Sequence, residues 1–149
     1  MKPTQNLLAM VVLIVSSTVL AESGIKSVVK DNANVRRGPG QNHEIFYKAP
    51  LGYPVKVERT QGDWMLCRDW EGDSGWIKRS LLGNIKTVVI LGSKLNLRQG
   101  PGVSQPIAEK TERGRIYKVL RSLDGWHQLG YFDSNEVAGW ARGDLVWGQ

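Results

Sequence analysis

The sequence contains one cysteine, two histidines and no apolar run long enough to cross a bilayer. Cys67 has no second cysteine to bond with, which excludes an intramolecular disulfide. The run from Leu7 to Val15 has nine apolar residues, whereas a spanning helix needs about 20. His43 and His127 lie far apart and show no short ligand spacing, so we expect no tetrahedral zinc site. No metal or cofactor is therefore predicted.

The start of the chain has the pattern of a secretory signal peptide. Lys2 supplies a positive charge, the apolar run follows, and Val19-Leu20-Ala21 gives a small-residue exit. We predict that residues 1–21 are removed after Ala21 and that the mature protein is periplasmic or secreted, with no membrane span. A retained anchor is the alternative, which the short apolar run disfavours.

The formal net charge of +6 favours anionic partners. It would be +5 once Lys2 leaves with the signal. For an exported protein these partners are cell-wall polymers, lipid head groups or acidic proteins, and we expect no nucleic acid. Simple solubility explains the charge equally well, because the basic residues are spread over the whole chain.

An internal repeat organises the chain. The frame Asn-(Val/Leu)-Arg-x-Gly-Pro-Gly occurs at positions 34–40 and again at 96–102, which is an offset of 62. We therefore predict two units, residues 22–84 and 85–149. The glycines and the proline favour an ordered loop with a tight turn. The repeated residues of this frame are Asn34, Arg36, Gly38 and Pro39 in the first unit and Asn96, Arg98, Gly100 and Pro101 in the second.

The pattern between turn residues predicts an all-β fold. Residues 55–58 alternate apolar and charged side chains, which is typical of a strand with one buried face. No stretch of the mature chain has the periodicity of a long helix, and single helical turns fit residues 79–82 and 143–146. The predicted strands cover residues 24–30, 45–48, 55–58, 64–70, 75–77, 117–119, 126–132 and 139–141.

Several aromatic and basic residues recur in both units. Four tryptophans lie at hairpin positions, three of them directly after a glycine, and we predict that they pack in or near the core. Arg36 and Arg98 either bind an anionic ligand or brace their loops against a carboxylate or carbonyl group. The residues concerned are Trp64, Gly75, Trp76, Trp126, Gly139 and Trp140.

With these motifs, each unit resembles a bacterial SH3 domain. The resemblance rests on the Asn-(Val/Leu)-Arg-x-Gly-Pro-Gly frame, a central Asp/Gly-Trp and a closing Gly-Trp-(Ile/Ala)-x-Arg-x-Leu, in the same order twice. It covers nearly all of residues 25–147 and implies two small, strongly bent β-barrels. Members of this family are usually non-catalytic modules that hold cell-wall peptide or a protein partner.

Six side chains are candidates for ligand binding. Trp70 and Phe132 are paired by the offset of 62 and, on an unbroken strand, would face away from the core. Stacking on a sugar ring or a partner and contact between the two barrels are equally open for this pair. The other candidates are Phe46, Tyr47, Arg37 and Arg79.

Three functions compete. The leading hypothesis is an exported, non-catalytic module that docks on cell-wall peptide or glycan. The alternative is a scaffold that binds an envelope protein or enzyme. A hydrolase using Cys67 with His43 or His127 ranks last, because Cys67 aligns with Leu129 in the repeat, which indicates a small core residue. We predict no catalytic residues.

Overall fold

The structure is a computed structural model that describes residues 23–134 and 136–149. The predicted signal peptide lies outside the described residues. Those residues form strands, two 3-10 turns and loops, which confirms the all-β prediction. None of them belongs to a helix with the length and apolar character needed to span a membrane.

The first barrel contains seven strands and one short helical turn. In chain order these are β1 (Gly24–Val28), β2 (Ala33–Arg36), β3 (Ile45–Ala49), β4 (Pro54–Gln61), β5 (Trp64–Arg68), β6 (Ser74–Lys78), η1 (Arg79–Leu81) and β7 (Leu82–Gly83).

The second barrel repeats this series. Its elements are β8 (Thr87–Ile90), β9 (Lys94–Arg98), β10 (Ile107–Glu112), β11 (Ile116–Leu123), β12 (Trp126–Gly130), β13 (Val137–Arg142), η2 (Gly143–Leu145) and β14 (Val146–Gly148).

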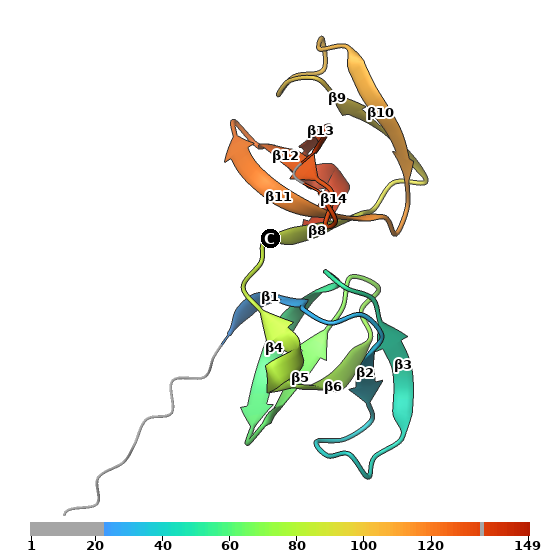
Figure 1. Cartoon of the computed structure of the whole chain (residues 1–149), viewed down its shortest axis with the longest axis vertical. Coiled ribbons are helices and arrows are strands. Elements are labelled where there is room, and N and C mark those ends of the chain that lie inside the picture. Colours follow the sequence, from blue (N-terminus) through green and yellow to red (C-terminus); the bar gives the residue numbers. More distant parts are fainter. Residues whose placement is uncertain (1–22, 135) are drawn as a thin grey trace, which may run out of the picture.

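The two barrels have the same topology, and Figure 1 shows them one above the other along the long axis. The strand order is β3-β2-β6-β5-β4-β1-β7 in the first sheet and β10-β9-β13-β12-β11-β8-β14 in the second. The long strands β4 and β11 each carry a register shift at the same point, beside Glu58 and beside Leu120. Such bulges bend a strand, which helps a small sheet to curve into a barrel.

Each barrel has its own apolar core. Cys67 and Leu129 occupy equivalent core positions and are 2% and 0% exposed, as the repeat predicted for the cysteine. Because side chains alternate along a strand, Trp76 faces away from the core that contains its neighbour Ile77. Trp76 is nevertheless buried, and the guanidinium of Arg59 lies 5.1 Å from the centroid of its ring.

The strands β5 and β12 are shorter than the sequence pattern predicted. We expected strands to Trp70 and Phe132, whereas β5 ends at Arg68 and β12 at Gly130. After β5, the Asp69 carboxylate accepts hydrogen bonds from the backbone N–H groups of Glu71 (3.0 Å) and Asp73 (2.9 Å). These bonds turn the chain, as Asp side chains commonly do. Trp70 is therefore a turn residue.

The junction between the barrels is very short. Asn84 accepts a hydrogen bond from Lys26 of the first barrel at 2.9 Å, and the Lys86 carbonyl accepts one from the Val119 N–H of the second at 2.9 Å. Ile85 lies between these two attachment points and is half-exposed. The barrels cannot tumble freely on such a linker.

The barrels also contact one another along a seam. The Phe132 ring covers Gly52 so closely that a Cβ there would lie 2.1 Å from a ring atom. The Arg113 guanidinium lies 4.7 Å from the centroid of the Trp70 ring, which joins the barrels by a cation–π contact. Val89 of β8 is fully buried but is not part of the second core, and β4 lies against β8. We call this set of contacts the seam.

Candidate functional site

Equivalent positions line a hollow in each barrel. The first groove has a volume of about 90 Å³ and the second about 230 Å³. The repeat offset is 62 up to the tryptophans and 64 from the facing cations onward, because the second copy has an insertion between them. The first groove is lined by Asn34, Arg36, Gln41, Trp64, Lys78 and Leu81. The second is lined by Asn96, Arg98, Val103, Trp126, Arg142 and Leu145, and is widened by Lys94 and Leu95.

A tryptophan faces a cation in both grooves. Trp64 opens β5 and pairs with Lys78 of β6, and Trp126 pairs with Arg142 in the same way. Residues directly opposite one another on antiparallel strands present their side chains on the same face. Both tryptophans are half-buried. Each groove therefore offers an aromatic surface beside a positive charge.

The two cations differ in their surroundings. Arg142 makes two hydrogen bonds to Asp144, of 2.6 and 2.9 Å. This pairing raises the pKa of Arg142, lowers the pKa of Asp144 and places a negative charge beside the second groove. Ser80 stands at the position of Asp144 in the first barrel. Within the described part of the chain, Lys78 makes no ion pair with a carboxylate. The cation that faces the tryptophan is thus neutralised by a carboxylate in the second groove and not in the first.

The repeated arginines brace the loops beside the grooves. Arg36 donates from Nη1 to the His43 carbonyl at 2.8 Å, and Arg98 donates to the Gln105 carbonyl at 3.1 Å. The two accepting residues are themselves equivalent positions of the repeat. The loop-bracing alternative is therefore the contact observed. Gly38 allows the loop to fold closely, because a Cβ there would meet the His43 ring at 2.4 Å.

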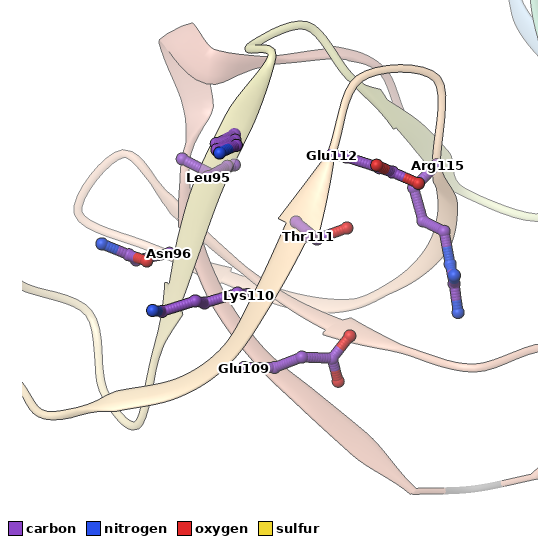
Figure 2. A pocket seen from close by; sticks show the side chains of 8 residues that line it. Leu95, Asn96, Glu109, Lys110, Thr111, Glu112 and Arg115 are labelled. Atoms are coloured by element: carbon purple, nitrogen blue, oxygen red, sulfur yellow. The ribbon is translucent and has the colours of Figure 1, made fainter.

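A larger hollow, with a volume of about 430 Å³, lies on β9 and β10 of the second barrel. Figure 2 shows that its side chains do not converge, since Glu109 and Arg115 point to one side of β10 and Asn96 and Lys110 to the other. Glu109 also accepts hydrogen bonds from Tyr131 and, at 3.1 Å, from Tyr117. Both carboxylate oxygens of Glu109 therefore already accept hydrogen bonds from within the barrel.

The first barrel contains a similar carboxylate–phenol cluster. Asp69 is 4% exposed and accepts hydrogen bonds from Tyr47 at 2.9 Å and Tyr53 at 3.0 Å. Burial, and then Asp69, raises the pKa of both phenols above the ordinary value of 10. Tyr47 and Asp69 correspond in the repeat to Glu109 and Tyr131. The contact is kept while donor and acceptor have changed places.

The structure brings together only some of the predicted ligand-binding residues. Phe46 and Tyr47 line one hollow of about 310 Å³ with Asp69, and the Arg37 guanidinium lies 3.7 Å from the centroid of the Phe46 ring. Trp70 and Phe132 lie at the seam instead, the alternative that sequence reasoning left open. Arg79 lies at the β4–β5 hairpin, where it donates to the Gly62 carbonyl at 3.3 Å.

The residues considered for hydrolysis are separated. Cys67 is buried in the first core, and burial raises its pKa to about 12. His127 belongs to the second barrel, where its Nδ1 lies 2.7 Å from the Ser122 hydroxyl and its Nε2 lies 2.8 Å from the Gln149 amide. Sequence reasoning missed this serine–histidine pair. Across residues 23–134 and 136–149, no group of three or more His, Cys, Asp or Glu side chains is placed to hold a metal ion.

Comparison with known proteins identifies the fold family. The sequence profile described as "Bacterial SH3 domain" matches twice, over residues 29–83 and 92–148. The chain belongs to the bacterial SH3 domain family. The two matches follow the two barrels, and the resemblance inferred from the repeated motifs is confirmed.

A curated relative of this bacterial SH3 protein comes from Bacillus subtilis (strain 168). It is YrvJ, provisionally named as an N-acetylmuramoyl-L-alanine amidase, and it is 27% identical over 141 residues. The match covers 87% of this chain but only 27% of YrvJ. The chain thus spans about a quarter of the length of this relative.

Two solved structures also match the bacterial SH3 pair. NlpC2 of Trichomonas vaginalis is 16% identical, with 84% of this chain and 48% of that chain covered. NlpC1 of the same organism is 16% identical, with 93% and 50% covered. Both TM-scores are 0.35, which is too low to support an inference.

Proposed function

We propose that this bacterial SH3 pair is a non-catalytic module that docks on the cell wall. Each groove would receive a carboxylate-bearing segment of wall peptide or glycan. The observation that carries the proposal is the facing Trp–cation pair, Trp64 with Lys78 and Trp126 with Arg142, which both barrels keep. A sugar ring or an apolar side chain suits the tryptophan surface, and a carboxylate suits the cation.

The charge and the relative support the same ligand class. The formal net charge of +6 attracts an anionic polymer over a longer range than any single contact. The name of YrvJ refers to the bond between N-acetylmuramic acid and L-alanine. A polymer containing that bond combines sugar rings with short peptides that end in carboxylates. It therefore offers both groups that the grooves would recognise.

The proposal requires export. We propose that residues 1–21 are cleaved and that the mature chain works in the periplasm or outside the cell. The N-terminal sequence of the protein recovered from culture tests this point, because it would begin at Glu22. A protein that keeps Met1 and stays in the cytoplasm would contradict the export proposal.

Co-sedimentation with purified cell wall tests the docking. The variant Lys78→Gln/Arg142→Gln removes the cation that faces the tryptophan in each groove. Lys30→Gln/Lys56→Gln is its control, because it removes the same charge at exposed positions outside the grooves. A surface ion pair contributes about 0.5 to 1 kcal/mol, so two together correspond to roughly a fivefold to thirtyfold loss of affinity. We expect that loss in the groove variant and a smaller one in the control.

Two results would contradict the docking proposal. Equal losses in the two variants would show that only overall charge matters. No sedimentation of the unaltered protein at low salt would remove the wall as a ligand altogether. Wall digested to free glycan and to free peptide, used as competitors, then shows which part of the polymer the grooves hold.

A further inference from the structure

The structure has two complete copies of one groove in a pair of barrels with little freedom to move. We propose that the two grooves hold separate strands of an anionic wall polymer at the same time, so that one chain of this protein bridges them. This inference rests on the proposed wall docking and extends it from a binder to a cross-bridge.

Both grooves keep the parts that binding needs. The asparagine, the arginine, the tryptophan and the leucine are identical at equivalent positions, and the cation is Lys78 in one and Arg142 in the other. The sixth position differs, with Gln41 in the first groove and the exposed Val103 in the second. Both barrels can therefore take the same class of ligand, an anionic chain with rings or apolar groups.

The barrels hold the grooves at a fixed separation. Only Ile85 lies between the hydrogen bond that ties Asn84 to the first barrel and the one that ties Lys86 to the second. The seam adds the packing of Phe132 on Gly52 and of Arg113 on Trp70. A short, stiff connection cannot bring two distant sites onto one short ligand segment.

The grooves lie toward opposite ends of the molecule. Gln41 belongs to the loop between β2 and β3, and Val103 belongs to the loop between β9 and β10. Figure 1 shows the β2–β3 loop at the lower end of the long axis and the β9–β10 loop at the upper end, with the seam between them. This arrangement favours two ligand strands over two neighbouring units of a single strand.

A sandwich assay tests the bridge with the complete chain. Purified wall is immobilised, the protein is added and washed, and soluble fluorescent wall fragments are then applied. The first-groove variants are Lys78→Gln and Trp64→Ala, and the second-groove variants are Arg142→Gln and Trp126→Ala. The charge variants guard against misfolding, since Lys78 and Arg142 lie outside both apolar cores. Lys30→Gln/Lys56→Gln is again the control.

We expect every single-groove variant to bind immobilised wall within a few-fold of the unaltered protein. Fragment capture should fall by about two- to fivefold in the charge variants and by about tenfold or more in the tryptophan variants, because the link to the second strand is weakened. The control should capture fragments normally. Mixing a first-groove variant with a second-groove variant should not restore capture.

Four outcomes would overturn the inference while leaving wall docking intact. The first is that the unaltered protein binds wall but captures no fragments, and the second is that single-groove variants capture fragments as well as the unaltered protein does. The third is that each single-groove variant loses wall binding completely, and the fourth is that the mixture of variants regains fragment capture. The third would mean that both grooves act on one strand, and the fourth that capture comes from association of separate chains. Failure of the unaltered protein to bind wall would instead contradict the proposed function, and the bridge with it.

Discussion

Asp69 holds the first barrel together at one turn, and its removal gives a measurable prediction. The carboxylate accepts hydrogen bonds from the Tyr47 and Tyr53 hydroxyls and from the backbone N–H groups of Glu71 and Asp73. A hydrogen bond to a charged group contributes about 1.5 to 3 kcal/mol. The two tyrosines are half-buried, so water replaces part of what they lose, and the two backbone groups lie in an exposed turn.

We expect Asp69→Ala to lower the free energy of unfolding by about 3 to 4 kcal/mol, near the lower limit for two hydrogen bonds to a charged group. A domain of this size has a total stability of about 3 to 9 kcal/mol. The substitution therefore removes much of the stability of the first barrel. Asp69→Asn keeps one oxygen acceptor and should lose about half as much.

Urea denaturation of the complete chain, followed by circular dichroism, measures these values. Asp73→Ala is the matched control, because Asp73 lies in the same turn and its side chain is exposed. It should cost about 0.5 kcal/mol or less. A cost for Asp69→Ala below about 1 kcal/mol, or one equal to that of the control, would refute the role given to this carboxylate.

The same cluster predicts an alkaline limit to stability. Burial and Asp69 raise the pKa of Tyr47 and Tyr53 above 10, so the folded barrel favours the protonated phenols. The two phenols therefore contribute fully to the free energy of unfolding below pH 10, and this contribution is lost as the pH rises above that value. The decline should be weaker in Asp69→Asn, which removes one of the causes of the shift. If the stability of Asp69→Asn declines as steeply at alkaline pH as that of the unaltered protein, groups other than this cluster cause the decline.

Three further predictions concern the seam, the thiol and the histidine. Gly52→Ala should separate the barrels and speed proteolysis at the junction between them. Gly72→Ala is the control, because Gly72 also has a positive φ but has open space around it, and it should not speed cleavage. Equal cleavage of the two variants would refute the packing of Phe132 on Gly52. Cys67, buried and with a pKa of about 12, should react with a thiol reagent only at the rate of unfolding, and prompt reaction in the folded state would contradict its core position. Burial lowers the pKa of His127 below 6.5, so the stability of the second barrel should fall as the pH drops below 6.5. His127→Gln should remove this pH dependence. If the dependence survives the substitution, another group causes it.

The sequence predicted the barrels well because strands and turns leave local signals. Gly-Pro-Gly and the alternation at residues 55–58 each determine structure over a few residues, and the repeat supplies a second copy of each signal. The errors were local too. The strand predicted to reach Trp70 ends early because the Asp69 side chain forms its own turn, an effect that periodicity does not reveal.

The grooves and the seam were harder to predict because they depend on strand register. Trp64 and Lys78 lie on different strands, and they become neighbours only because β5 and β6 pair in one register. For Trp70 and Phe132 the sequence left two alternatives open, ligand stacking and contact between the barrels. An outward-facing side chain can meet either one, and the sequence does not show which. Tyr47 was chosen as a ligand residue, while its hydrogen bond to Asp69 could not be read from either residue alone.

The exchange of carboxylate and phenol between the barrels also affects how the chain folds. Similar tandem repeats risk exchanging strands with one another during folding. Here a strand exchange would place Tyr47 beside Tyr131, and Asp69 beside Glu109, at positions that each hold one donor and one acceptor in the correct barrels. The two carboxylates at one site would repel each other, and the two phenols at the other site would lose their charged acceptor. The exchanged polarity thus lets each repeat distinguish its own strands from those of its twin.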